Sequence, residues 1–316
     1  MTPLLRSIRS ADWIWAALGS LAMWLLLGGF AHNLNLESLI ATSTTAAFLA
    51  IVALGQMIVV TTGRGAIDLS IPGVITLAAY LATGMSLGSN LRLLYVFPLA
   101  LAMGAGVGLL NALAVLLLRI PPIIATLGMG YIVTTLILVY NPHYRSTYVA
   151  SLLTHVARDR VLGVVPVVVL VAVALVAFFT WILRSTKFGK ALAALGQSLP
   201  AARLSGVDVN GIQVIAYVMS GVLAAFGGVL ISARVGGAFL GLGDPYLLET
   251  VGSVVVGGTL IMGGRAVPVG TLFGSLFLVL LVTAMQVAGM RIGGQFVAEG
   301  ALIILVLFLA APRARG

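Results

Sequence analysis

The sequence predicts an all-α polytopic membrane protein, and three observations support this fold class. Hydrophobic residues make up 61% of the 316 residues, and the mean hydropathy is +1.18. Charged residues account for only 8%. Several apolar runs approach the roughly 20 residues that cross a bilayer as a helix. Because no soluble domain is left between these runs, we expect a single transmembrane domain over residues 1–316.

A hydropathy window of about 19 residues predicts about ten membrane spans. The first apolar run follows Arg6 and Arg9 and is longer than the apolar core of a typical signal peptide, so we expect a retained first helix. The expected spans are 12–31, 41–62, 70–88, 94–118, 122–141, 162–183, 212–233, 246–262, 266–288 and 294–312.

The distribution of Lys and Arg predicts that both termini lie in the cytoplasm. With the N-terminus inside, eleven of the 17 basic residues fall in inside segments and six in outside segments. The net charge of +9 comes from residues scattered singly between apolar runs. This pattern is typical of topology signals, so we expect contact with membrane lipid and no nucleic-acid partner.

Two polar segments are longer than a turn requires. Residues 142–161 fall outside and are expected to form a short surface helix or a docking lip. Residues 184–211 fall inside, where Ser198 is suited to cap a helix and Gly206 to end it. This predicts a short helix at about 199–205 that presents Arg203 and Leu204. A solvated loop and a helix lying on the lipid surface remain alternatives.

Residues 63–73, GRGAIDLSIPG, interrupt the apolar pattern between the second and third spans. One interpretation is structural: Asp68 or Ser70 caps the third span, and Pro72 occupies its first turn. The other is functional: a helix broken beside a translocation path offers backbone groups and a carboxylate to a hydroxyl-rich solute. The sequence leaves both interpretations open.

Signatures of catalysis and of cofactor binding are not found in the sequence. The nearest candidate for a phosphate-binding loop, Phe188-Gly189-Lys190, has no upstream glycine and is followed by Ala191. The chain contains no cysteine, and its three histidines lack metal-ligand spacing. We therefore expect no catalytic residue, metal or cofactor, and we expect any energy from ATP to come from another chain.

The sequence contains four notable stretches, which lie at 65–73 (GAIDLSIPG), 119–129 (RIPPIIATLGM), 186–207 (TKFGKALAALGQSLPAARLSGV) and 254–276 (VVVGGTLIMGGRAVPVGTLFGSL). Taken in order, they resemble permease subunits of bacterial ABC importers for ribose, xylose, galactose and related sugars. The first is similar to the family's G-I-D-L-S-V-G signature, but Ile71 and Pro72 depart from it. The third has Ser198 where the family has asparagine, and Ala266 in the last stretch stands near an expected glycine.

The resemblance implies a permease subunit of a sugar importer in the bacterial inner membrane. It implies separate ATPase subunits inside, a periplasmic or lipid-anchored substrate-binding protein outside, and a homodimer or a pair with a similar permease. Alternatives are a permease for nucleosides or branched-chain amino acids, an ion-coupled secondary transporter, and a membrane-embedded enzyme.

Candidate site residues fall into two groups. The candidates for the substrate pathway are Asp68, Ser70, Gln56, Thr126 and Gln286, of which the last three are too dispersed in the sequence to predict a pocket. The candidates for ATPase coupling are Ser198, Pro200, Ala201, Ala202, Arg203, Leu204 and Ser205.

Two pairs of sequence features suggest an inverted repeat of spans 2–5 and 7–10. GRGAIDLS follows the second span and GLGDPYLLE the seventh, and these two spans run in opposite directions in the expected topology. GAGVG at 104–108 and GTLFG at 270–274 form the other pair. Close helix packing alone also explains such glycine pairs, so this alternative stays open.

Overall fold

The computed structural model describes residues 13–31, 35–141, 144 and 148–310. Within these ranges the chain is predominantly helical, with one two-stranded antiparallel hairpin. The elements are α2 (Trp13–Ala31), α3 (Leu36–Thr61), α4 (Ile71–Ser86), α5 (Asn90–Leu116), α6 (Pro122–Tyr140), α7 (Ser151–Arg158), β1 (Arg160–Val161), β2 (Val165–Pro166), α8 (Val167–Ser185), α9 (Lys187–Gln197), α10 (Leu199–Leu204), α11 (Val209–Val235), α12 (Tyr246–Val256), α13 (Pro268–Val287) and α14 (Ile292–Ala310).

Six of the described helices are long and apolar enough to cross a membrane, namely α3, α5, α6, α8, α11 and α13. Four shorter apolar stretches lie in α2, α4, α12 and α14. The expectation of an all-α polytopic membrane protein is therefore confirmed. Each of the ten expected spans overlaps one of these ten helices.

Three expected boundaries were wrong, each for a local reason. The span expected from 162 starts at Val167, because Leu162 and Gly163 adopt left-handed conformations and turn the chain between β1 and β2. The span expected to reach 262 ends at Val256, where Gly257 and Gly258 follow. The span expected from 41 already begins at Leu36, because the Asn35 side chain accepts a hydrogen bond from the Ser38 amide.

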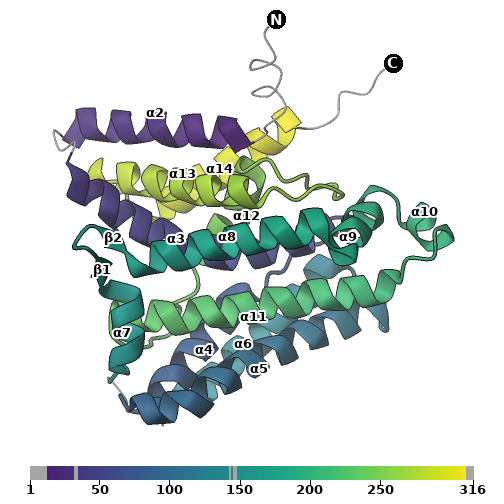
Figure 1. Cartoon of the computed structure of the whole chain (residues 1–316), viewed down its shortest axis with the longest axis horizontal. Helices are drawn as coiled ribbons and strands as arrows, with labels where there is room; N and C mark the ends of the chain where they lie inside the picture. The colour runs from purple at the N-terminus through teal and green to yellow at the C-terminus, as the bar shows by residue number, and fades with distance from the viewer. Residues whose placement is uncertain (1–12, 32–34, 142–143, 145–147, 311–316) are drawn as a thin grey trace, which may run out of the picture.

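Helices α3 and α11 form the centre of the bundle, with α4 and α5 packed against α11 (Figure 1). Glycines permit the closest approach. A methyl group at Gly104 of α5 would collide with the Gly221 carbonyl of α11, and one at Gly108 would collide with the Tyr217 carbonyl. The GAGVG stretch therefore brings α5 directly onto α11.

The GTLFG stretch packs differently, since Gly270 and Gly274 of α13 lie against the backbone of Gly257, directly after α12, and of Ser253 within α12. Helix α13 also carries α2 on its other side, where the rings of Trp13 and Phe273 stack. The two glycine stretches thus join different pairs of helices, which favours the close-packing interpretation for them.

Helix α7 and the hairpin lie at one end of the long helices, and α9 and α10 lie at the other (Figure 1). We call these the α7 end and the α10 end. Part of the expected surface helix in 142–161 is confirmed by α7, while residues 142–143 and 145–147 lie outside the described residues.

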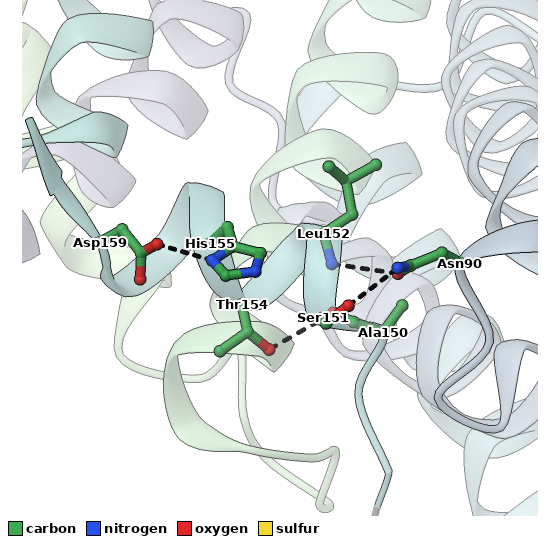
Figure 2. A network of polar contacts seen from close by, with 7 residues as sticks. All are labelled: Asn90, Ala150, Ser151, Leu152, Thr154, His155 and Asp159. Carbon is green, nitrogen blue, oxygen red and sulfur yellow. Dashed lines mark hydrogen bonds and ion pairs between the residues drawn. The ribbon is translucent and has the colours of Figure 1, made fainter.

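Hydrogen bonds from two directions fix α7 in place. At its first turn, the Asn90 side chain from the start of α5 donates to the Ser151 hydroxyl and accepts from the Leu152 amide (Figure 2). At its last turn, the Arg158 guanidinium donates to the carbonyls of Ala233 and Arg234, which end α11. The helix is therefore tied to two of the helices that form the core.

Candidate functional site

The GRGAIDLS stretch forms a break between α3 and α4 that folds back into the bundle. Gly63, Arg64 and Gly65 all have positive φ angles, which reverse the chain directly after α3. The following residues then return between the helices, and the Asp68 side chain is only 2% exposed. A buried carboxylate needs hydrogen-bond donors around it, and the neighbouring helices supply them.

Asp68 is held by groups from four parts of the chain. Its Oδ1 accepts bonds from the amide and hydroxyl of Ser70, at 3.0 and 2.6 Å, and a longer bond of 3.4 Å from Asn111 Nδ2 on α5. Its Oδ2 accepts from the Ser220 hydroxyl on α11 at 2.7 Å. Its backbone amide donates to Gln56 Oε1 on α3 at 3.2 Å. We call Gln56, Asp68, Ser70, Asn111 and Ser220 the Asp68 cluster.

The expected capping role is corrected by these contacts. Ser70 is the residue that precedes α4, yet its side chain makes no capping hydrogen bond to the helix. Its hydroxyl donates to Asp68 and accepts from Asn111 Nδ2 at 2.8 Å instead. Pro72 does occupy the first turn of α4, where a missing amide hydrogen costs nothing. The Asp68 carboxylate thus joins helices rather than capping one.

Thr126 of α6 holds the other side of the same break. Its hydroxyl accepts from the Leu69 amide and donates to the Ile67 carbonyl, both at 3.0 Å. Gly130, one turn further along α6, lies against the Leu69 carbonyl. The RIPPIIATLGM and GAIDLS stretches, 57 residues apart at this bond, therefore form one unit.

A second break, over residues 236–245, separates α11 from α12 and enters the bundle from the α7 end. Gly236 and Gly241 have positive φ angles. The Gly243 amide donates to the Thr76 hydroxyl of α4 at 3.0 Å, and any side chain at 243 would collide with the Pro72 carbonyl. The two breaks therefore meet inside the bundle at the start of α4.

Gln286 does not join the Asp68 cluster. It lies near the end of α13 and lines a separate cavity of about 320 Å³ with Arg234, Glu249 and threonines of α3 and α13. Four of the five candidates for the substrate pathway are thus brought together, and the fifth is not.

Several polar atoms beside Asp68 are buried without a hydrogen-bond partner among the described residues. They are Nε2 of Gln56, Oδ1 of Asn111 and the hydroxyl of Tyr217. Buried polar atoms without partners are rare in proteins, and they concentrate here around one carboxylate. This region has more hydrogen-bonding capacity than its own contacts use.

Asn111, Ser220 and Thr76 were not among the residues selected from the sequence. Each is an uncharged polar residue in an apolar helix, all three are buried, and all three bond to one of the two breaks. Polar residues within apolar helices are the signal that could have identified them. Serine and threonine often bond to their own helix instead, so that signal has low specificity.

The coupling candidates lie on and around α10, which confirms the expected short helix. The Ser198 hydroxyl accepts from the Ala201 amide, and Gly206 with φ of +77° ends the helix. Ala202 is buried against Leu195 of α9 and Val209 of α11. Leu204 is 91% exposed, and Arg203 is exposed beside it.

The α9–α10 pair is attached firmly to the transmembrane helices. Gly196 at the end of α9 contacts the Thr61 carbonyl of α3 and the backbone of Gly264. The Gly264 amide, from the loop between α12 and α13, donates to that Thr61 carbonyl at 3.0 Å. The end of α9 is therefore joined to α3 just before the GRGAIDLS break.

Comparisons with known proteins agree with this architecture. A family model described as "Branched-chain amino acid transport system / permease component" matches residues 38–312. The ribose import permease protein RbsC of Escherichia coli (strain K12) is 32% identical over 265 residues, covering 82% of this chain and 81% of the relative. No solved structure gives a significant match.

Two further relatives have related import functions in their names. The galactose/methyl galactoside import permease protein MglC of Escherichia coli (strain K12) is 31% identical over 303 residues, covering 89% of this chain and 87% of the relative. The autoinducer 2 import system permease protein LsrC of Photorhabdus luminescens is 28% identical over 276 residues, covering 87% and 82%.

The apolar helices, together with the two polar breaks between them, define a multi-pass helical membrane protein. The chain belongs to the family of permease components of the branched-chain amino acid transport system type, since the family model spans most of its length.

Proposed function

We propose that this chain is the transmembrane permease subunit of an ABC importer that passes a sugar, a pentose, hexose or related solute, across the inner membrane. The observation that carries the proposal is the similarity over about four fifths of the chain to import permeases named for ribose and galactose. The four stretches that resemble sugar permeases also support it, because two of them form one hydrogen-bonded unit around Asp68.

In this proposal ten helices cross the membrane and both termini lie in the cytoplasm. Helices α3–α6 and α11–α14 form two inverted repeats. The support for a repeat is that each half has a long central helix, then a break entering the bundle, then a shorter helix, and that the two breaks meet at Pro72 and Gly243. Such broken helices are a common design at transport pathways.

The partners in this proposal bind at opposite ends of the bundle. At the α10 end, Arg203 and Leu204 offer a positive charge and an apolar side chain to a separate ATPase subunit. At the α7 end, the surface around α7 receives a periplasmic or lipid-anchored substrate-binding protein. A second permease, identical or similar, completes the transport path.

In the proposal the Asp68 cluster connects the α10 end of the bundle to the substrate pathway. The cluster ties the GRGAIDLS break to α3, α5 and α11, and the break begins two residues after Thr61. A displacement of α10 therefore has a direct structural route to the start of α4.

A branched-chain amino acid is the second candidate solute, because the matching family model carries that description.

Uptake measurements with a panel of solutes distinguish a sugar from a branched-chain amino acid. The chain is produced with its ATPase and binding protein in cells without sugar or amino acid importers of their own, and uptake of radiolabelled D-ribose, D-galactose, D-xylose, uridine and L-leucine is measured. Uptake of one sugar in large excess over leucine is the expected result. Uptake of leucine or uridine alone would contradict the sugar assignment.

A further inference from the structure

A small cavity of about 170 Å³ lies where the two breaks meet α6. It is lined by residues from the start of α4, from the middle of α6 and from the junction of the second break with α12. Its polar side chains are Tyr131, Thr134 and Asp244, and its apolar lining includes Leu127 and Leu247. None of its three polar side chains belongs to the Asp68 cluster.

The cavity lies at mid-depth in the membrane. Tyr131 is the midpoint of α6, nine residues from either end of a helix that is long and apolar enough to span the bilayer. At 1.5 Å per residue this places Tyr131 about 13 Å from each end of α6, and Thr134 about 9 Å from the Tyr140 end. Asp244 lines the same cavity and follows Gly243, which bonds to Thr76 of α4.

Asp244 is exposed in the monomer, and no described residue forms a hydrogen bond or ion pair with its carboxylate. Its position is fixed by the backbone, because its amide donates to the Gly241 carbonyl and its own carbonyl accepts from the Leu247 amide. A carboxylate at this depth costs several kcal/mol if it faces lipid, so such residues normally face a bundle interior or a water-filled path. Asp244 therefore marks an aqueous face of the bundle.

The Thr134 hydroxyl also makes no hydrogen bond to a described residue, unlike the hydroxyl of its neighbour Thr135. The Thr135 hydroxyl donates to the Tyr131 carbonyl of its own helix at 2.8 Å, as most threonines in these helices do. Among the described residues Thr134 has no such bond, although it is exposed on the same helix. Tyr131 is 68% exposed, so the ring and hydroxyl of its side chain are both accessible.

We propose that Asp244, Thr134 and Tyr131 form a contact site for a neutral polyhydroxylated solute as it passes the middle of the membrane. A carboxylate has two oxygens that accept hydrogen bonds from adjacent hydroxyl groups, and a threonine hydroxyl both donates and accepts. An aromatic ring packs against the apolar C–H face of a sugar ring. The site rests on the proposed function and adds the residues that contact the solute in the membrane.

The residues lining the cavity disfavour other ligands. No lysine or arginine lines it, so the carboxylate group of an amino acid would meet no positive charge there. A single carboxylate is also too few ligands for a metal ion, and no group of three or more metal-ligating side chains occurs among the described residues. The hydroxyl groups of a solute can form hydrogen bonds with all three polar side chains.

The absence of cysteine from the chain allows a direct accessibility test. Single cysteines are introduced as Thr134→Cys and Leu136→Cys in the complex with ATPase and binding protein. Leu136 is 55% exposed on α6 but points about 200° away from Thr134. An impermeant charged thiol reagent should label Thr134→Cys at least tenfold faster than Leu136→Cys. Equal rates, or cross-linking of Thr134→Cys between two permease copies with no labelling, would overturn the site.

Transport measurements provide the second test, with D-ribose and D-galactose as the probes. Asp244→Asn, Asp244→Ala and Thr134→Val should each lower the maximal uptake rate at least fivefold at equal amounts of complex in the membrane. Thr135→Val, which removes a hydroxyl already bonded to its own helix, should stay within twofold of the wild type.

The outcomes separate this site from the proposed function. If the wild-type complex transports neither sugar, the proposed solute class is wrong, and so is the contact site formed by Asp244, Thr134 and Tyr131. If the wild type carries a sugar and the Asp244 and Thr134 variants carry it at the normal rate, the proposed function stands and the site is wrong.

Discussion

The Ser220 hydroxyl donates a 2.7 Å hydrogen bond to the Asp68 carboxylate across 152 residues of sequence. This bond fastens the GRGAIDLS break to α11, the helix that contacts α3, α4 and α5. Since both residues are buried, loss of the donor leaves a carboxylate oxygen without compensation in an apolar interior.

Ser220→Ala should therefore destabilise the protein by about 1–3 kcal/mol, the usual cost of an unsatisfied buried acceptor. The measurement is the apparent Tm of the detergent-purified protein. Ser232→Ala is the matched control, because Ser232 is equally buried on α11 but bonds only to the Val229 carbonyl of its own helix. Equal Tm values for the two variants would show that the Asp68 bond contributes nothing to stability.

Asp68→Asn should separate geometry from charge. Asparagine retains one acceptor oxygen for Ser70 and Asn111, and its amide nitrogen replaces the oxygen that accepts from Ser220. The negative charge is then lost, and the Ser220 hydroxyl must turn to accept a hydrogen bond instead of donating one. We expect reduced uptake together with a lower Tm, and a larger loss of both in Asp68→Ala. Normal uptake in both variants would limit Asp68 to a dispensable role.

Gly243→Ala should prevent the two breaks from meeting. A methyl group there would collide with the Pro72 carbonyl, and a backbone carbonyl cannot move aside as a flexible side chain can. We expect a large loss of monodisperse protein in size-exclusion chromatography. Gly237→Ala, in the same break, should behave as the wild type, because nothing lies within 4 Å of a methyl group at that position and its φ angle is not positive. A monodisperse, active Gly243→Ala protein would contradict the contact.

Arg158→Ala should loosen α7 at the α7 end, because the guanidinium satisfies two carbonyls at the end of α11. Hydrogen exchange should rise in α7 and in the last turn of α11. His155→Ala should have little effect, since the His155–Asp159 pair drawn in Figure 2 is more than half exposed, and exposed pairs contribute little. Similar exchange in both variants would assign the docking of α7 to its apolar contacts instead.

The order and approximate limits of the helices could be predicted from the sequence, because the thickness of the bilayer sets the length of an apolar segment that crosses it. Boundaries failed where a turn was decided locally, as at Leu162 and Gly163. Four of the five pathway candidates converge, but their convergence could not be predicted. Thr126 meets Leu69 only because Gly130 lets α6 approach the break, and that is a property of packing rather than of hydropathy.

Asp244 illustrates a different failure. The sequence placed it in a loop between spans, where an aspartate before a proline is an ordinary turn residue. The depth of Asp244 in the membrane depends on the second break, which enters the bundle as far as Pro72. No local sequence pattern indicates this. The three buried residues Asn111, Ser220 and Thr76 were missed for a related reason, since their partners lie far away in the sequence.

Arg203→Glu and Leu204→Asp should weaken co-purification of the ATPase and lower solute-stimulated ATP hydrolysis several-fold. Both side chains are exposed on α10, so neither change disturbs the buried Ala202 contact that holds the helix. Lys190→Glu on α9 makes the same charge reversal outside α10 and should have a smaller effect. Unchanged co-purification in both α10 variants would leave α10 as a solvated surface helix.

The sidedness of α10 is open to an independent check in the cysteine-free chain. Ser198→Cys should resist an impermeant thiol reagent added to intact cells and react in inverted membrane vesicles, because the topology predicted from Lys and Arg places residues 184–211 inside. Labelling from outside in intact cells would reverse the topology.

The energy source of transport tests the central claim most directly. The chain is reconstituted with its ATPase and binding protein in proteoliposomes, and uptake of radiolabelled sugar is followed with ATP, with ATP plus vanadate, and with ionophores that collapse ion gradients. An importer powered by a separate ATPase predicts uptake that requires ATP, stops with vanadate and persists with ionophores. Uptake that continues with vanadate and collapses with the ion gradient would contradict the account and identify an ion-coupled transporter.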